Sequence, residues 1–429
     1  MTDQKVNVRY LVLELLLEIL EQKEYSHVAL QGALEKYQYL DRQDRAFLTR
    51  LTEGTIERLI ELDAILHQFS KVPVKKMKPV IRTILRMSVY QLRYMDRIPD
   101  AAVCNEAVRL AEKKGFKGLK GFVNGVLRTI AREKYKLVFD DLSVKYSMPE
   151  WIVTQWTKEY GQQTAVKMLE SQYTERPVTI RVNLSKISTE TLKNRLESEG
   201  VTAHHVEGMD CALAISGYDH IRGIPSFQEG LFQVQDVSSM WVGLLAAPKR
   251  DDYCIDVCAA PGGKSLHLAD LLQGTGMVEA RDLTDYKVEL IKEHIARTGV
   301  QNVQAVRMDA TLLDQASIEK ADLVLADLPC SGLGVLGKKR DLKYRITPEQ
   351  QEDLVRLQRR ILDTIWQYVK PGKTLIYSTC TIHREENEGN VMWFTKQYPF
   401  LLKKQKLLLP GIDPWDGFYI AKLERKVYD

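Results

Sequence analysis

The chain has 429 residues, of which 28% are charged and 45% are apolar, and its net charge is +4. That length suffices for two or three domains, and the composition is typical of a soluble globular protein rather than a disordered or fibrous one. No apolar run approaches about 18 residues, so no transmembrane helix is expected. The start, Met1–Lys5, lacks the order of a signal peptide, because Glu14 and Glu18 interrupt the apolar run that follows. Six scattered cysteines suit a reducing, cytoplasmic location better than a disulfide framework.

The charge is unevenly distributed along the chain. Residues 1–140 contain 25 Lys and Arg against 18 Asp and Glu, whereas the remainder contains 36 against 39. A basic N-terminal third joined to a near-neutral body indicates that one end of the chain binds a polyanion.

Residues 1–137 are predicted to form a bundle of about six helices. Apolar residues recur at helical spacing over 8–19 and 47–62, and Asp41 is a candidate N-cap for the second segment. Further helices are expected at Pro79–Tyr90, where proline lies in the first turn, at Val103–Lys114 and at Gly121–Lys134. The basic face of this bundle is either a solvated scaffold surface or an RNA-binding one, and charge alone does not decide. The candidate RNA-binding residues are Lys75, Lys76, Lys78, Arg82, Arg86, Lys113, Lys114, Lys117 and Lys120.

Residues 138–240 are predicted to form a small α+β module. Short helices are expected at Trp151–Tyr160 and Thr164–Ser171, and a third, over 189–197, has Ser188 as its N-cap. Extended segments are expected at Pro177–Asn183, Ala212–Ser216 and Phe227–Asp236. No third histidine or cysteine lies near His204 and His205 at a metal-ligand spacing, so no metal site is expected.

From Tyr253 onward, predicted strands alternate with helices, which indicates a parallel sheet with helices on both faces. The predicted helices are Lys287–Thr298 and Pro348–Val369, the second of which is expected to end at Pro371-Gly372. Ligands of such sheets bind outside the carboxyl ends of the strands. Five successive strand ends here have polar or reactive residues, so a site is predicted at this edge; the strands are Tyr253–Cys258, Gly276–Asp282, Val303–Asp309, Ala321–Asp327 and Thr374–Cys380.

A Gly-rich turn follows the first of these strands and opens a helix at Lys264. The bare backbone at Gly262 and Gly263 lets a ligand approach the helix amides closely. A phosphate-binding P-loop is the main alternative, but it requires a glycine where Cys258 stands.

Two acids at the following strand ends suggest a nucleoside ligand. Asp282 lies twenty residues past Gly262, where a dinucleotide fold places the acid that holds the ribose hydroxyls. Asp309 is a candidate partner for an adenine amino group. The turn lacks the fingerprint of an NAD site. Together with two cysteines at strand ends, the acids therefore favour a methyl donor, S-adenosylmethionine.

Those cysteines, Cys330 and Cys380, each follow a strand in a polar segment, although a buried inert thiol is the usual alternative. A thiolate is a natural nucleophile for a pyrimidine. Its addition to carbon 6 of cytosine converts carbon 5 into an enamine carbon that attacks a methyl sulfonium. Asp327 is placed to protonate the ring nitrogen or to bond it during addition. The residues alone do not decide which cysteine attacks.

The chain resembles a known family in several specific motifs. Asp256–Ser265, Asp327–Gly332 and Tyr377–Asn387 resemble three signature motifs of the Sun-type RNA cytosine-5 methyltransferases, and Asp416–Lys422 resembles their closing strand. The N-terminal third resembles the NusB antitermination-factor domain through Asp41–Phe47, Glu106–Ala111 and Phe122–Arg128. Two departures are Leu328, where the family often has alanine, and Arg281, where an apolar residue is expected before the acid.

The resemblance implies a multidomain chain. It would have an all-α NusB-like helical RNA-binding domain at 1–138, a small α+β linker or RNA-binding module at 139–238, and a Rossmann-like α/β methyltransferase domain at 239–429. It implies methylation of carbon 5 of one cytosine in 16S ribosomal RNA, with Cys380 as nucleophile and Cys330 assisting release of the product. The residues implied to line the S-adenosylmethionine pocket are Cys258, Ala259, Ala260, Pro261, Gly262, Gly263, Lys264, Asp282, Asp309 and Asp327.

Alternatives from other classes stay open at this point. The same chemistry could act on transfer RNA or large-subunit RNA, or the chain could be a non-catalytic NusB-like RNA-binding protein. DNA methylation would require a base-flipping recognition domain, and no segment suggests one. The basic segment 338–345 is a candidate RNA-binding loop or a solvated mobile one. No membrane or metal partner is expected, and a monomer is the default expectation.

Overall fold

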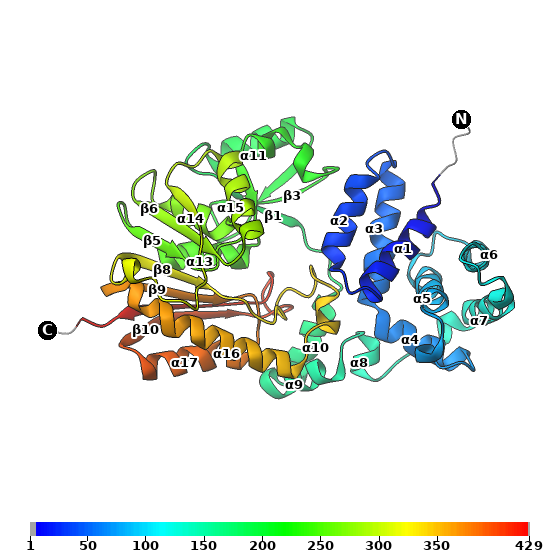
Figure 1. Ribbon diagram of the computed structural model, residues 1–429. Helices are drawn as coiled ribbons and strands as arrows, with labels where there is room; N and C mark the ends of the chain where they lie inside the picture. The colour runs from blue at the N-terminus through cyan, green and yellow to red at the C-terminus, as the bar shows by residue number, and fades with distance from the viewer. Residues whose placement is uncertain (1–5, 428–429) are drawn as a thin grey trace. The chain divides into compact units, whose positions relative to one another are not determined.

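The computed structural model describes residues 6–427, so Met1–Lys5, discussed above, lies outside the described residues. The chain divides into two compact units (Figure 1). One unit comprises Met1–Leu169 and Lys338–Arg345, and the other comprises Glu170–Gly337 and Ile346–Asp429. Each unit is described by itself.

The first unit is helical and has one continuous hydrophobic core. Asp41 caps its third helix, as predicted, since its Oδ1 accepts a hydrogen bond from the Asp44 amide at 2.7 Å. Two details of the prediction are wrong. The expected helix over 47–62 is broken at Arg58 into two. An additional helix, α2, was not predicted, because the residues it buries are two alanines and one leucine. The helices are α1 Val8–Leu20, α2 Ser26–Lys36, α3 Arg42–Glu57, α4 Leu59–Phe69, α5 Pro79–Tyr94, α6 Asp100–Lys113, α7 Lys120–Glu133, α8 Leu142–Lys145 and α9 Glu150–Tyr160, with α10 Gln162–Ser171 at the boundary between the units.

The segment 338–345 belongs to this helical unit, and most of it is not a solvated loop. Lys343 is buried, and its Nζ donates to the Glu57 carbonyl at 2.9 Å. Burial lowers the pKa of Lys343 to about 7. Asp341 is buried as well and accepts a hydrogen bond from the Ser26 hydroxyl at 2.6 Å. Of the five basic residues here, only Lys338 and Lys339 are exposed, which leaves little of the expected RNA-binding surface.

The second unit begins with a four-stranded antiparallel sheet in the order β2-β3-β1-β4. Ser188 caps α11, as predicted, by accepting from the Thr191 amide. The expected extended piece over 227–236 is mostly wrong, because a short helix precedes a strand of three residues. The elements are β1 Val178–Val182, α11 Thr189–Ser198, β2 Thr202–His205, β3 Ala212–Ser216, α12 Pro225–Gln228, β4 Phe232–Val234 and α13 Val237–Ala246.

A seven-stranded sheet in the order β10-β11-β9-β8-β5-β6-β7 forms the rest of the unit. Five strands, β9, β8, β5, β6 and β7, are parallel, as predicted. The expectation of a purely parallel sheet is wrong, because β11 pairs antiparallel with β9, and β10 pairs antiparallel with β11. The strands are β5 Tyr253–Asp256, β6 Met277–Asp282, β7 Val303–Arg307, β8 Ala321–Asp327, β9 Val369–Thr379, β10 Phe400–Leu408 and β11 Phe418–Arg425.

Helices cover both faces of this sheet, as predicted (Figure 1). One hydrophobic cluster joins the sheet to α13, α14 and α15, and another joins it to α16 and α17. The expected helix Pro348–Val369 ends early: α16 stops at Ile365, and β9 already includes Pro371 and Gly372. The pairing of β9 with β8 is irregular there, which accommodates both residues. The helices are α14 Gly263–Leu271, α15 Asp285–Thr298, α16 Pro348–Ile365 and α17 Glu388–Gln397.

Two arginines join the four-stranded sheet to the larger one. Buried Arg181 on β1 donates to Gln235 at 2.9 Å and pairs with Asp270 on α14 at 3.4 Å. Arg297 on α15 lies 4.0 Å over the Phe227 ring and donates to the Phe227 carbonyl at 2.8 Å. The small module is therefore fixed to the helices that cover the larger sheet. Within residues 6–427, no helix has both the length and the apolar content that a membrane crossing requires.

Candidate functional site

The Gly-rich turn joins β5 to α14 at the carboxyl edge of the sheet. The Ala259 amide donates to the Arg281 carbonyl of the neighbouring strand at 2.8 Å, which anchors the turn. Gly262 adopts a φ of +106°, a conformation that favours glycine. A Cβ built at Gly263 would meet no atom within 4 Å, so the first turn of α14 faces open space. The turn fits a nucleoside ligand at the helix N-terminus.

Asp282 lies at the end of β6 beside this turn. Its Oδ2 accepts from the Ala260 amide at 2.9 Å, and its Oδ1 accepts from the Leu283 amide at 2.8 Å and lies 3.0 Å from Lys287 Nζ. The carboxylate is almost fully buried. The structure therefore brings the predicted ribose-binding acid against the predicted turn.

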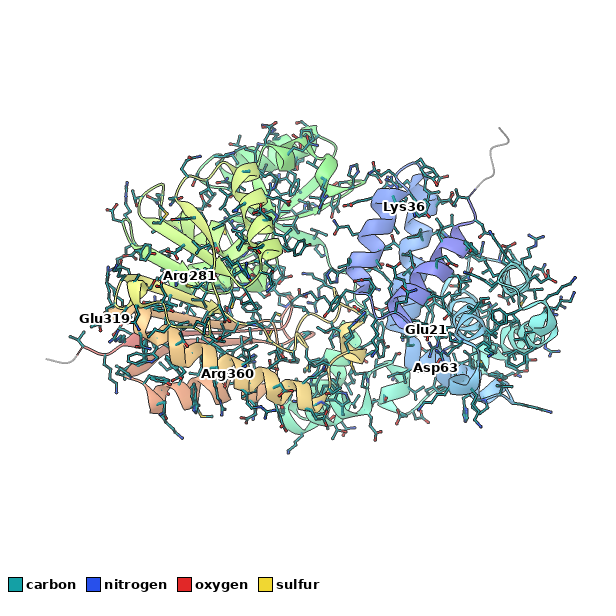
Figure 2. The ribbon with its side chains drawn as sticks, in the orientation of Figure 1. Glu21, Lys36, Asp63, Arg281, Glu319 and Arg360 are labelled. Carbon is teal, nitrogen blue, oxygen red and sulfur yellow. The ribbon has the colours of Figure 1, made fainter. Side chains whose placement is uncertain are left out.

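Arg281 does not disturb the placement of Asp282. This arginine, labelled in Figure 2, is buried and bonds the Glu279 carboxylate at 2.6 Å and the Ser317 hydroxyl at 2.6 Å. Its guanidinium lies 5.4 Å from the centre of the Tyr368 ring. The buried guanidinium is thus satisfied by Glu279 of the same strand and by residues of short segments outside the sheet, and β6 pairs in parallel with β7 as far as Asp282.

The predicted adenine partner, Asp309, lies two residues beyond the end of β7. Its Oδ1 accepts from the Thr311 hydroxyl at 2.7 Å and the Thr311 amide at 2.8 Å. These hydrogen bonds lower the pKa of Asp309 below its ordinary value. One carboxylate oxygen thus stabilises the turn in which Asp309 sits.

Cys258 is a packing residue of the turn. Burial raises the pKa of its thiol above the ordinary value, and the nearby Asp256 carboxylate adds to the effect. The thiol therefore stays protonated at neutral pH and has no nucleophilic form to offer.

Cys330 and Cys380 meet at the carboxyl ends of β8 and β9, with their sulfur atoms 3.3 Å apart. The hydrogen bond to Cys380 raises the pKa of Cys330 well above its ordinary value, and burial adds to this effect. We therefore assign the shared proton to Cys330, which donates it toward the sulfur of Cys380. The structure therefore brings the two predicted cysteines into direct contact at this edge of the sheet.

Lys264 and Asp327 form an ion pair, with Nζ 2.6 Å from Oδ2. Burial by itself would lower the pKa of Lys264, but the attraction of Asp327, helped by the sulfur of Cys380, raises it above the ordinary value. The Ser378 hydroxyl donates to the other oxygen of Asp327 at 2.8 Å. The site therefore has a protonated amine beside a carboxylate, and the amine interacts electrostatically with the sulfur of Cys380.

A buried polar network lies around the two cysteines, and sequence reasoning gave its members no role. Glu386, Asn387 and Gln358 are fully buried and bond the residues that flank both cysteines. Glu386 and Asn387 lie inside a recognised motif, where only the cysteine was given a function. Gln358 left one signal, a polar residue on the apolar face of α16 between Val355 and Ile361.

In the helical unit, the predicted RNA-binding residues fall into two groups. Arg82 and Arg86 bond Glu21 at 2.6 Å and Asp63 at 2.6 and 2.7 Å, and both acids are labelled in Figure 2. Lys114 is paired with Glu14. Other members are exposed to solvent, namely Lys75, Lys76, Lys78, Lys113, Lys117 and Lys120. Within this second group, Lys120 Nζ lies 3.5 Å from Glu112 Oε1, and Lys113 Nζ lies 3.9 Å from the centre of the Tyr10 ring.

The histidine pair that was considered for metal binding lies on β2, where the His205 ring is 2.9 Å from Glu190. Throughout residues 6–427, no group of three or more His, Cys, Asp or Glu side chains is arranged to hold a metal ion.

Comparison with known proteins gives three family matches along the chain. The model described as "16S rRNA methyltransferase RsmB/F" matches residues 243–424, "NusB family" matches 6–132, and "Methyltr_RsmF/B-like, ferredoxin-like domain" matches 148–221.

Curated relatives and solved structures agree with these matches. A "Probable ribosomal RNA small subunit methyltransferase B" of Bacillus subtilis is 36% identical over 99% of this chain and 100% of its own length. A protein of the same description from Synechocystis is 32% identical over 98% and 100%. The crystal structure of PH0851 superposes with a TM-score of 0.85 at 25% identity, over 98% of this chain and 99% of that one. NSun6 from Pyrococcus horikoshii, solved with SFG, is 26% identical with a TM-score of 0.59, over 66% of this chain and 99% of that one.

Proposed function

This chain belongs to the family of ribosomal RNA small subunit methyltransferase B, and we propose that it methylates carbon 5 of a cytosine in 16S ribosomal RNA through a covalent adduct on Cys380. It is an S-adenosylmethionine-dependent RNA methyltransferase. The observation that carries the proposal is the pair of cysteine sulfurs 3.3 Å apart beside the Lys264–Asp327 ion pair. A cofactor turn close to two paired cysteines suits this reaction and not simple RNA binding.

The cofactor site is formed by the turn 258–264 with the acids that follow β6, β7 and β8, which are Asp282, Asp309 and Asp327. The open space at Gly263 and the buried acid beside Ala260 fit a nucleoside with free ribose hydroxyls. When bound, S-adenosylmethionine supplies an electrophilic methyl group. The residues of the chain hold it against the edge of the sheet where the cysteines lie.

The reaction begins when the Cys380 thiolate adds to carbon 6 of the cytosine. The ring nitrogen that gains electron density takes a proton from the Lys264–Asp327 pair, in which Lys264 carries the proton. Because Asp327 is paired with the Lys264 ammonium group, its role is to relay the Lys264 proton to the ring nitrogen, not to donate a proton of its own. Carbon 5 then takes up the methyl group, whose bond to the sulfonium sulfur breaks to leave a neutral thioether, and the proton of carbon 5 is lost to solvent water. The ring nitrogen returns its proton, and the bond between sulfur and carbon 6 breaks.

Two observations support Cys380, rather than Cys330, as the nucleophile. Cys330 holds its proton, since its hydrogen bond to Cys380 raises its pKa. The Lys264 ammonium interacts electrostatically with the sulfur of Cys380 and attracts negative charge there. Cys330 is left as the protonated neighbour that assists departure of the methylated base.

We further propose the division of labour along the chain that was expected from the sequence. Residues 1–138 form a NusB-like RNA-binding domain, 139–238 form a linker or RNA-binding module, and 239–429 form the catalytic domain; the three family matches support this division. The reaction requires reduced thiols, which favours a reducing compartment such as the cytoplasm. A metal-free monomer is sufficient for every step above.

The test is methyl transfer from labelled S-adenosylmethionine to unmodified 16S RNA, with bisulfite mapping of the product. Transfer RNA and large-subunit RNA are tested in parallel, together with Cys380→Ala and Cys330→Ala. A single 5-methylcytosine in 16S RNA, absent with Cys380→Ala, supports the substrate and the nucleophile. Covalent RNA–protein adduct should accumulate with Cys330→Ala and be absent with Cys380→Ala.

Other results would overturn parts of the proposal separately. Label in transfer RNA or large-subunit RNA alone overturns the substrate and keeps the chemistry. Adduct formation by Cys380→Ala reverses the assignment of the two cysteines. Absence of label from every RNA, with normal S-adenosylmethionine binding, favours an RNA-binding protein.

A further inference from the structure

Glu386 and Asn387 are adjacent residues whose side chains are fully buried beneath the two cysteines. A buried carboxylate and a buried amide are costly unless their hydrogen bonds are satisfied. Here the bonds of Asn387 go to the residues before and after Cys380. Those of Glu386 go to Ser331, which follows Cys330, and to Gln358 and His383. These contacts concern the placement of the thiols, a matter separate from cofactor binding.

The contacts of Glu386 hold the segment that contains Cys330. Its Oε2 accepts from the Ser331 amide at 2.9 Å, and its Oε1 accepts from the Ser331 hydroxyl. Gln358 on α16 donates to Glu386 Oε2 at 3.0 Å and to the Pro329 carbonyl at 2.8 Å. Ser331, which follows Cys330, thus bonds the Glu386 carboxylate directly. Pro329, which precedes Cys330, bonds the Gln358 amide that the same carboxylate orients.

The contacts of Asn387 hold the segment that contains Cys380. Its Oδ1 accepts from the Thr379 hydroxyl at 2.5 Å, and its Nδ2 donates to the Thr381 carbonyl at 3.0 Å. The single amide thus spans the two neighbours of Cys380. Since its acceptor and its donor are both used, the side chain has one orientation that satisfies the site.

One hydrogen bond joins the two halves of this arrangement. The Ser331 and Thr381 hydroxyl oxygens lie 2.7 Å apart. Because the Ser331 hydroxyl donates to the carboxylate of Glu386, we assign Thr381 as the donor to Ser331. The separation of the sulfurs is then set by two side-chain anchors and the bridge between them.

We propose that Glu386 and Asn387 are separate positioning residues, Glu386 for Cys330 and Asn387 for Cys380. The chemical consequence rests on the proposed roles of the two cysteines. Displacing Cys380 slows attack on carbon 6, so adduct forms slowly. Displacing Cys330 slows departure of the product, so adduct accumulates. Neighbouring substitutions should therefore have opposite effects on the amount of adduct.

The first experiment compares Glu386→Gln and Asn387→Ala in the full-length protein. Glutamine keeps the shape of Glu386, but its amide has one acceptor oxygen instead of two. Its NH2 group would face the Ser331 or Gln358 groups that donate to the carboxylate. The matched control is Glu385→Gln, the same change at the exposed neighbouring residue. A displacement of about 1 Å can lower a rate about a hundredfold, so kcat should fall by that order in both variants. The KM for S-adenosylmethionine should stay within about threefold, because neither side chain touches the cofactor turn.

The adduct measurement distinguishes positioning from a general loss of structure. RNA–protein adduct is trapped by denaturation at early times with unmodified 16S RNA. We expect more adduct than in the wild type for Glu386→Gln and less for Asn387→Ala, while Glu385→Gln behaves as the wild type. No change in kcat in either variant would refute the positioning.

A second experiment measures the thiol geometry without RNA or catalysis. Diamide oxidises two thiols to a disulfide: the thiols lose two protons and two electrons, and the reagent becomes the hydrazine. Sulfurs 3.3 Å apart need little movement to reach a bond length of about 2.05 Å, so the wild type should form the Cys330–Cys380 disulfide quickly. Both variants should form it about tenfold or more slowly, as followed by peptide mass spectrometry, since a modest misplacement of reacting atoms has effects of this size.

The two experiments separate failure of this inference from failure of the proposed function. Slower disulfide formation without the opposite adduct effects keeps the positioning and overturns the assigned roles of the cysteines. Unchanged disulfide formation overturns the positioning itself. If a variant fails to fold, Ser331→Ala removes the hydroxyl bonds to Glu386 and Thr381, and Thr379→Val removes the hydroxyl bond to Asn387. Each must change the amount of adduct in the same direction as its partner.

Discussion

Replacing Asp327 by asparagine removes the negative charge next to Lys264 and keeps the shape of the side chain. The ion pair spans 2.6 Å between strand β8 and the first turn of α14. Asparagine can still accept from the Ser378 hydroxyl, which bonds Oδ1 at 2.8 Å. The substitution therefore tests the charge alone. Because burial would then dominate, the pKa of Lys264 should fall, and the alkaline limb of the kcat–pH profile should move to lower pH.

The size of the effect follows from two independent considerations. Loss of a positioned proton-transfer group lowers a rate by about 10²- to 10⁴-fold, or about 2.7 to 5.4 kcal/mol in the barrier. Leaving one member of a buried ion pair without its partner destabilises a protein by about 3 to 5 kcal/mol. The side chains of Lys264 and Asp327 are 18% and 25% exposed, which favours the lower end of the second range. Activity and stability must therefore be measured separately.

The assay combines methyl-transfer kinetics with chemical denaturation for two variants. Asp327→Asn should lose both activity and stability. Adding Lys264→Met removes the stranded ammonium group, so stability should recover by about 1 kcal/mol or more while activity stays lost. Binding of S-adenosylmethionine, measured by equilibrium dialysis, reports whether the folded site persists. Activity of Asp327→Asn within threefold of the wild type, or activity regained in the double variant, would refute proton transfer by this pair.

Three further predictions concern stability and RNA binding. Burial raises the pKa of Asp256 to about 7, so the contribution of this carboxyl group to stability is present below about pH 4 and is lost as pH rises to 7. Asp256→Asn should abolish this loss of stability, which is at most about 4 kcal/mol, and unfolding titrations across that pH range measure it. A Cβ at Gly54 would lie 2.0 Å from the buried Tyr90 ring, so Gly54→Ala should destabilise by about 1 to 3 kcal/mol, whereas Gly32→Ala on exposed α2 should stabilise by about 0.5 to 1 kcal/mol in thermal unfolding. Charge reversal of the exposed lysines should weaken RNA binding and reduce the salt slope by about one per lysine, whereas Lys36→Glu on another helix should do neither; the reversed residues are Lys75, Lys76 and Lys78.

The edge of the sheet was predictable from the sequence because its signals are local. Apolar runs ended by a Gly-rich turn or by an acid identify strand ends without knowledge of the fold. Parallel strands then bring those ends to one edge, and the structure has Asp282, Asp327 and both cysteines at or just after the ends of β6, β8 and β9. Even Arg281, which departs from the expected pattern, leaves this register intact, because its guanidinium is bonded by the Glu279 carboxylate and the Ser317 hydroxyl.

The elements that were missed depend on pairing with distant parts of the chain. Strand β10 carries exposed lysines as an edge strand does, and its pattern indicates a strand only once β11 is beside it. Pro371 and Gly372 are typical of a turn, yet the irregular pairing of β9 accommodates them. The basic composition of 338–345 suggested a solvated loop, whereas contacts with residues more than 280 positions earlier bury Lys343. Tertiary contacts decided each of these cases.

Glu386 and Asn387, the residues proposed to position the cysteines, differ in whether their contacts are local in the sequence. Asn387 bonds the flanks of Cys380 from six and eight positions away, so its role is contained in one segment of the chain. Glu386 acts on Ser331 from 55 positions away, and no local pattern contains that contact. The Tyr377 hydroxyl donates to the Glu386 carbonyl and fixes the loop that presents both side chains. The segment that follows β9 can therefore position Cys380 through contacts within itself. It can position Cys330, which follows β8, only because β8 and β9 are neighbours in the sheet.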